Sequence, residues 1–227
     1  MVKRGPHELM VAIVIDDMGL DAMQSGRVLE LPAPLTLSFL TYAPNLQAWS
    51  QRARAAGHEI LAHLPMEPLD SGKNPGPGAL RVAMNPAEVR AQVAANLDAW
   101  TGFVGASNHM GSRFCQDRPL MGAVMAELKS RGLAWVDSRT TAATQGIAAA
   151  AAAGVAFVSR DVFLDNVQTL DGVRTQLEEM EAVCRDKGRA VAIGHPVDAT
   201  IEALERWLPA LGQKGLTLAP ISALLVG

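Results

Sequence analysis

Short apolar runs, each ending in a polar or charged residue, recur along the whole chain. Five of them cover residues 11–17 (VAIVIDD), 59–63 (EILAH), 105–109 (GASNH), 134–137 (AWVD) and 190–195 (AVAIGH), and a sixth, 156–161 (AFVSRD), ends in an Arg–Asp pair. Apolar runs of this length between turn residues are typical of strands buried on both faces of a sheet. Because the carboxyl ends of parallel strands share one rim, we expect these polar residues to lie close together.

Helical segments alternate with these runs. In residues 86–101 apolar side chains recur at helical spacing, and Asn85 with Glu88 predicts a capping box, with Pro86 at the first helical position. Further helices are expected over residues 21–31, 45–56, 119–131 and 144–153, over a stripe from 173 to 184, and after Asp198 as a cap. Several of these segments stop at a glycine, as helices commonly do.

Repeated strand–helix alternation predicts an α/β fold with a mainly parallel sheet and right-handed crossovers. About eight strand candidates favour a (β/α) barrel, irregular or incomplete, over an open doubly wound sheet, with the site at the carboxyl ends of the strands. The sequence after the first strand is Asp16-Asp17-Met18-Gly19, whose carboxylates would repel a pyrophosphate, so dinucleotide binding is disfavoured. We expect one domain over residues 11–227 after an N-terminal extension of residues 1–10.

Composition narrows the classes of function. A chain of 227 residues that is 49% hydrophobic can bury a sizeable core. A formal charge of -3 without a basic cluster argues against nucleic acid as a partner. No apolar stretch approaches the ~20 residues that span a bilayer, and the first ten residues do not resemble a signal peptide. Cys115 and Cys184 form no metal-binding or disulfide pattern, and nothing indicates the oligomeric state.

The first strand ends in two adjacent carboxylates, Asp16 and Asp17. Like charges so close together need a cation or donors nearby, although Asp17 or Asp21 could instead cap the following helix. His63 and His109 each end an apolar run, where a single histidine would most often be a core residue. Together, two imidazoles and a carboxylate form a common catalytic zinc set that leaves a position open for water.

The remaining polar residues at these ends have two readings each. His195 lies in Gly194-His195-Pro196 and is either a turn residue or a general acid. Arg113 and Arg160 could orient carboxylates, hold an anionic group or lie on the surface. Asp137 and Asp161 are candidates to orient a histidine or to contact substrate. His7 and His58 end no strand-like run and are assigned to solvent.

Four motifs resemble the divergent polysaccharide deacetylase family, a branch of the carbohydrate esterases with a (β/α) barrel. They are residues 15–19 (IDDMG), 57–68 (GHEILAHLPMEP), 108–112 (NHMGS) and 194–196 (GHP), in the order that the family shows. The resemblance covers about residues 11 to 225. It implies that Asp16 is the catalytic base, that Asp17 binds metal and that His195 is the general acid.

The second motif of that fold normally carries two metal-binding histidines four residues apart. This chain keeps His63 but has Glu67 at the second place, where Pro65 also excludes a helical pair, so His109 would complete the metal set. The usual arginine of the third motif would be represented by Arg113. The resemblance therefore implies a divalent metal, with zinc favoured by the nitrogen and oxygen donors, held by Asp17, His63 and His109.

These observations together predict a metal-dependent hydrolase that removes acyl (N-acetyl) groups from an acetylated polysaccharide or oligosaccharide by hydrolysing an amide bond. The alternative is a non-catalytic carbohydrate-binding or envelope-associated protein on a degenerate deacetylase barrel. Glu67 favours this alternative, whereas Asp16 and His195 count against it. Phosphodiester hydrolysis is disfavoured because the chain has no clustered basic groove. The resemblance also implies a periplasmic or envelope location.

Overall fold

The computed structural model describes residues 9–227, and in this part of the chain nine strands form one parallel sheet. The strands are β1 (Leu9–Met18), β2 (Thr36–Leu40), β3 (Glu59–Met66), β4 (Gly105–Met110), β5 (Ala134–Asp137), β6 (Phe157–Ser159), β7 (Val162–Phe163), β8 (Arg189–Gly194) and β9 (Leu216–Leu218). The first strand begins at Leu9, two residues earlier than expected. Most of the expected N-terminal extension, residues 1–8, lies outside the described residues.

The sheet curls into an incomplete barrel. Its strand order is β6-β5-β4-β3-β2-β1-β8-β7, and β9 pairs with the first residues of β1 on the edge that β2 occupies further along. Only Arg160 and Asp161 separate β6 from β7 in sequence, so the two ends of this order approach each other although no ladder joins them among residues 9–227. The expected irregular (β/α) barrel with parallel strands is confirmed.

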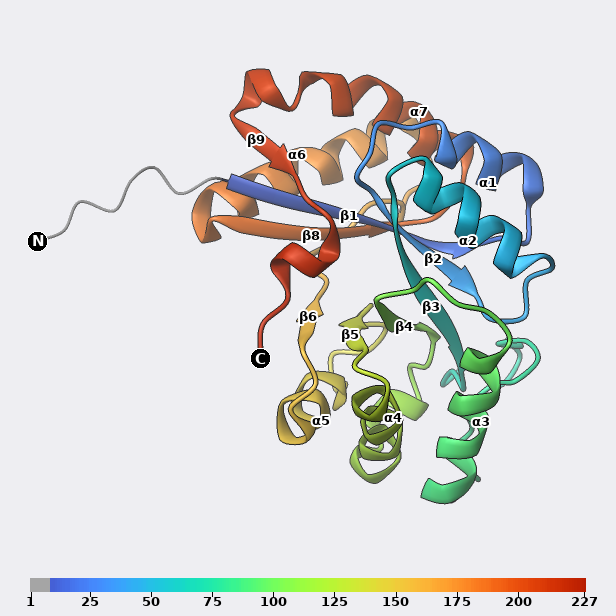
Figure 1. The fold of residues 1–227 in the computed structure, drawn as a ribbon. Coiled ribbons are helices and arrows are strands. Elements are labelled where there is room, and N and C mark those ends of the chain that lie inside the picture. The colour runs from blue at the N-terminus through green and yellow to red at the C-terminus, as the bar shows by residue number, and fades with distance from the viewer. Residues whose placement is uncertain (1–8) are drawn as a thin grey trace, which may run out of the picture.

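Helices cover the outside of the sheet (Figure 1). They are α1 (Ala22–Leu29), α2 (Leu46–Ala55), α3 (Pro86–Asp98), α4 (Arg118–Ser130), α5 (Gly146–Ala153), α6 (Leu170–Lys187) and α7 (Asp198–Trp207), with short 3₁₀ turns at Phe114–Gln116, Leu208–Ala210, Gly212–Lys214 and Ile221–Leu224. The Asn85–Glu88 capping box of α3 is present as predicted. The cap position of α7 is Val197, so the expected cap at Asp198 is wrong, and Asp198 instead pairs with Arg27. None of the helices in residues 9–227 is long and apolar enough to cross a membrane.

Two apolar layers hold the barrel together, one on each face of the sheet. Along β1, Val11, Ile13 and Ile15 belong to the larger cluster under the helices, whereas Ala12 and Val14 belong to the smaller cluster inside the barrel. The smaller cluster is completed by residues from neighbouring strands and by Ile221 and Leu224. Since side chains alternate across a strand, a residue two places beyond an interior residue faces the interior too. At the carboxyl ends of the strands, the barrel interior is therefore lined by the residues that lie two positions after these apolar residues.

His58 contradicts its assignment to solvent. Its side chain is buried, its Nδ1 accepts a hydrogen bond from the backbone N–H of Leu35, and its Nε2 lies 3.3 Å from the carbonyl oxygen of Leu29. Burial lowers the pKa of this imidazole, which favours the neutral form that its acceptor role requires. His58 therefore joins the start of β3 to the chain before β2.

Candidate metal centre and active site

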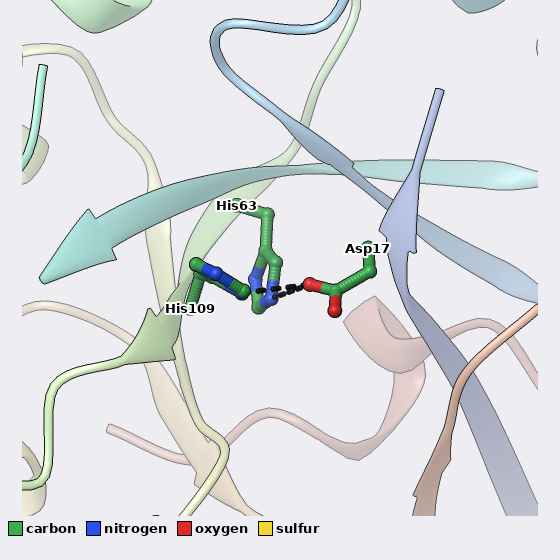
Figure 2. A group of neighbouring side chains, drawn as sticks. All are labelled: Asp17, His63 and His109. Atoms are coloured by element: carbon green, nitrogen blue, oxygen red, sulfur yellow. Dashed lines mark ion pairs between the residues drawn. The ribbon is translucent and has the colours of Figure 1, made fainter. Parts of the chain in front are cut away.

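Asp17, His63 and His109 come together from β1, β3 and β4 (Figure 2). Asp17 Oδ1 lies 2.7 Å from His109 Nδ1 and 3.3 Å from His63 Nε2. One ligand atom from each residue lies within 4.8 Å of the other two. These residues lie 46 or more positions apart in the sequence and on three different strands, and the carboxyl ends of the strands bring them together as expected.

The local backbone explains how two adjacent carboxylates reach one site. Asp16 continues the interior face of β1 after Ala12 and Val14. Asp17 would face outwards in a regular strand, but its backbone adopts a left-handed conformation with φ of 57°, which turns the chain at the strand end. The N-cap of α1 is Asp21 and not Asp17, and the Asp21 carboxylate accepts from the N–H groups of Met23 and Gln24.

The electrostatics of the three residues fit a cation. Burial alone would raise the pKa of the Asp17 carboxyl, yet the adjacent His109 and His63 hold it well below its usual range. Asp17 Oδ1 is buried and, among the described residues, accepts no well-formed hydrogen bond, although two imidazole nitrogens face it. Three lone-pair donors that converge without a proton donor in good geometry match a divalent ion with nitrogen and oxygen ligands.

The other ring nitrogen of His63 is also held. His63 Nδ1 lies 2.7 Å from Ser107 Oγ, which lies 2.7 Å from Ser38 Oγ, and all three side chains are buried. A hydrogen bond at Nδ1 leaves Nε2 free to face Asp17 and His109. Such a partner fixes both the tautomer and the ring orientation of a metal-binding histidine.

Asp16 lies beside the three ligand candidates and is 3% exposed. Its Oδ2 accepts a hydrogen bond of 3.2 Å from Ser138 Oγ, and its Oδ1 lies 3.6 Å from His63 Nδ1. No hydrogen-bond partner for Oδ1 is found in residues 9–227. Asp16 therefore presents one free oxygen beside the candidate metal centre.

His195 follows β8 and forms a close pair with Asp165, a residue that the sequence analysis did not single out. His195 Nδ1 lies 3.0 Å from Asp165 Oδ1, and Asp165 Oδ2 accepts from the backbone N–H of His195 and from Thr200 Oγ1. Burial lowers the pKa of His195, but the hydrogen bond and charge of Asp165, with smaller effects of Asp16 and Asp17, raise it to about 9. The other ring nitrogen, Nε2, lies 3.9 Å from Asp17 Oδ2.

The expectation that Asp137 or Asp161 orients His195 is wrong. Asp137 accepts from the N–H of Arg139 and from Thr144 Oγ1, and it is fully buried under the turn after β5. Asp161 accepts from Lys187 Nζ at the end of α6 and from the N–H of Val191 in β8. Both carboxylates accept from backbone N–H groups, Asp137 from Arg139 in the turn after β5 and Asp161 from Val191 within β8, which satisfies these N–H groups.

Arg160 braces the turn after β5. Its Nε donates to the carbonyl oxygen of Ser138, its Nη2 donates to that of Arg139, and its guanidinium lies 5.0 Å above the ring of Phe163. Phe163 in turn contacts the ring of His195 edge-on. Arg160 therefore lies near both catalytic candidates but is occupied by backbone carbonyls.

Glu67 lies apart from the three ligand candidates and ties the loop after β3 to the turn after β4. Its Oε2 accepts from the N–H of Val82, its Oε1 lies 3.3 Å from Arg113 Nη1, and its backbone carbonyl accepts from the N–H groups of Arg113 and Phe114. Arg113, for which the sequence left open a role in orienting a carboxylate, in holding an anionic group or on the surface, pairs with Glu67 and is 54% exposed. The residue at the second-histidine position thus fixes a loop.

We expect Glu67→Ala to lower the free energy of unfolding by about 1–3 kcal/mol, because the partly buried Val82 N–H loses its acceptor. Arg113→Ala is the matched control and should cost less than about 1 kcal/mol, since its side chain is 54% exposed. Urea unfolding measures both values. Metal binding should be unchanged in each variant, and loss of metal in Glu67→Ala would show that Glu67 serves the metal centre.

Comparisons with known proteins give a consistent result. A family model described as divergent polysaccharide deacetylase matches residues 13–225. The uncharacterized protein YibQ of Escherichia coli is 34% identical over 216 residues, which are 95% of this chain and 67% of that protein. The crystal structure of the uncharacterized protein ATU2773 from Agrobacterium tumefaciens is 30% identical, with a TM-score of 0.93 over 97% of this chain and 91% of that one. BA3943 from Bacillus anthracis, a CE4 family pseudoenzyme, shares the fold at 14% identity, with a TM-score of 0.58 over 97% of this chain and 66% of that one.

Proposed function

The chain belongs to the divergent polysaccharide deacetylase family, and on this basis we propose that it is a metal-dependent hydrolase that removes N-acetyl groups from a polysaccharide or oligosaccharide. The observation that carries the proposal is that Asp16 and the His195–Asp165 pair both lie next to one Asp–His–His cluster, Asp16 Oδ1 at 3.6 Å from His63 Nδ1 and His195 Nε2 at 3.9 Å from Asp17 Oδ2. This arrangement supplies a base and an acid around a single reaction centre. We further propose a periplasmic or envelope location, which the family resemblance supports.

The metal would be held by Asp17, His63 and His109, with zinc favoured by the donor set. When bound, such an ion supplies Lewis acidity, which lowers the pKa of a water and polarises an acyl carbonyl. The free Oδ1 of Asp16 is suited to accept the proton of the attacking water. Its other oxygen, Oδ2, accepts a hydrogen bond from the Ser138 hydroxyl, which restrains the orientation of the carboxylate.

His195 would donate a proton to the leaving nitrogen of the sugar amine. Its raised pKa, about 9, keeps the imidazole protonated at neutral pH. Asp165 accepts at Nδ1, so the Nε2 proton is the one presented towards Asp17 and the reaction centre. The carboxylate also stabilises the charged ring until the proton has been transferred.

The competing function is glycan binding without catalysis. Glu67 at the position of the second histidine supports it, and so does the fold shared with a pseudoenzyme. However, the Glu67 carboxylate is bonded to the N–H of Val82 in the loop after β3, and His109 contributes the second imidazole to the cluster. We therefore favour the hydrolase.

Acetate release from acetylated chitooligosaccharides and peptidoglycan fragments tests the proposal. The hydrolase should release acetate with added zinc and stop when a chelator is present. Glycan binding by calorimetry without acetate release, at any metal tested, would favour the binding protein instead.

The proposed base gives a separate prediction. Asp16→Asn should leave the zinc stoichiometry unchanged, because Asp16 is not one of the three ligands, and should lower kcat by about 10²–10⁴-fold. Metal analysis and acetate release on the same preparation check both parts. A variant with wild-type kcat would remove Asp16 from the mechanism, and one without zinc would make it a ligand.

A further inference from the structure

Ser138 is the first residue after β5, and its side chain lies against Asp16. Its Oγ donates to Asp16 Oδ2 at 3.2 Å, joining two residues 122 positions apart, and Ser138 is 4% exposed. We propose that Ser138 is a positioning residue that fixes the carboxylate of Asp16, so that Oδ1 is the oxygen that receives the proton. This inference rests on the proposed function, since it assigns a partner to the proposed base.

The backbone of Ser138 is held on both sides. Its N–H donates to Asn108 Oδ1 at 2.9 Å, and its carbonyl oxygen accepts from Arg160 Nε at 2.8 Å. The amide of Asn108 is itself fixed, because its Nδ2 donates to the carbonyl oxygen of Met110. With both backbone groups bonded, Ser138 cannot shift without leaving a polar backbone group unpaired, which is unfavourable in a buried position.

The next residue in the turn is strained and held in place. Arg139 has a left-handed backbone with φ of 49°, a conformation that is unfavourable for a non-glycine residue. Its N–H donates to Asp137 Oδ1 at 2.8 Å, and its carbonyl oxygen accepts from Arg160 Nη2 at 3.1 Å. These bonds compensate the strain and set the direction in which Ser138 points.

The arrangement assigns different tasks to the two oxygens of Asp16. Oδ2 is occupied by the Ser138 hydroxyl, whereas Oδ1 is buried and has no hydrogen-bond partner within residues 9–227. A carboxylate free to rotate about its Cβ–Cγ bond would spend part of the time with neither oxygen suitably placed. Holding one oxygen orients the other, and misplacement of a catalytic group by about 1 Å is expensive.

Asp137 and Arg160 then act through Ser138. The Asp137 carboxylate accepts from the N–H of Arg139, and Arg160 donates to the carbonyl oxygens of Ser138 and Arg139, so their hydrogen bonds hold the turn that carries Ser138. From the sequence, each of them is a residue that could orient a group of the site or contact the substrate. Their effect on the reaction should depend on the presence of the Ser138 hydroxyl.

The test compares kcat, KM and zinc content of the full chain for Ser138→Ala and Ser138→Thr on acetylated chitooligosaccharide. Ser138→Ala should lower kcat about 10–100-fold, with KM within about twofold and zinc unchanged. Ser138→Thr keeps the hydroxyl and should recover most of kcat. Ser50→Ala is the matched control, because it deletes another buried serine hydroxyl, bonded at 2.7 Å to the carbonyl of Thr101, and should leave kcat unchanged.

A double-mutant cycle with Arg160→Ala tests the route of action. Arg160→Ala should lower kcat in the wild-type background and change it little when Ser138 is already alanine. Wild-type kcat in Ser138→Ala, or loss of zinc from it, would overturn the positioning role while leaving the proposed function intact. Fully multiplicative effects of the two substitutions would also overturn it. A wild-type protein that releases no acetate with any metal would overturn this inference and the proposed function together.

Discussion

Asp17→Asn and His109→Ala should each abolish stoichiometric zinc binding and lower acetate release by at least about 10³-fold. Each removes one of the three proposed protein ligands, and a catalytic zinc site with two remaining ligands loses both affinity and geometry. Asp17→Asn has a second effect, because the carboxylate that faces both imidazoles loses its negative charge. His63 Nε2 and His109 Nδ1 then lose the carboxylate that faces both of them.

Metal analysis after dialysis against a defined zinc concentration measures the first effect, and single-turnover acetate release measures the second. His58→Ala is the matched control, since His58 is also a buried histidine but lies outside the site. It should keep one zinc per chain, although it will unfold more readily. Retention of zinc by both site variants would contradict the ligand assignment, because no single ligand would then matter.

The alternation of side chains along the strands accounts for most of the site. The apolar interior of the barrel includes Val14, Leu61, Val136, Val158 and Ile193. Two positions further along each strand are Asp16, His63, Ser138, Arg160 and His195. The polar end of the barrel is thus a continuation of its apolar interior, and a period of two is readable from sequence once the strands are known.

The errors in the sequence analysis follow from the same rule. Asp137 and Asp161 were selected because they are charged and end a strand, but each is one position out of this register, beside Ser138 and Arg160. A one-residue shift along a strand moves a side chain to the other face. Ser138 could have been found by applying the alternation strictly, since it follows Val136 by two.

Asp165 could not have been found in this way. It follows β7, which is two residues long and too short to show a period. The partner of His195 is decided by where the chain after β7 passes β8, and this is a contact over 30 residues. Glu67 is similar, because its contacts with Val82 and Arg113 depend on the path of a long loop. Sequence spacing carries no information on either.

Asp165→Asn should lower kcat at neutral pH by about 10²-fold or more and move the alkaline limb of the pH–rate profile to lower pH. The acid must be protonated to donate, so the rate falls as the pH rises through the pKa of His195. In the wild type this pKa is raised to about 9, mainly by Asp165. Asp17 also raises the pKa of His195 by a smaller amount, and a cation bound to Asp17 would offset part of that effect. The wild-type limb should therefore lie at or somewhat below pH 9.

Without the Asp165 charge, burial still lowers the pKa of His195, so the limb should move towards the ordinary histidine value of about 6.5. Profiles of kcat/KM between pH 5 and 10 measure this for the free enzyme. Asp161→Asn is the matched control, because its carboxylate bonds Lys187 and Val191 and not His195, and its limb should stay with that of the wild type. If the alkaline limb moves equally in both variants, the loss of negative charge in general, and not the hydrogen bond from His195 to Asp165, determines the pKa of the acid. If the limb moves in neither variant, His195 is not the proton donor.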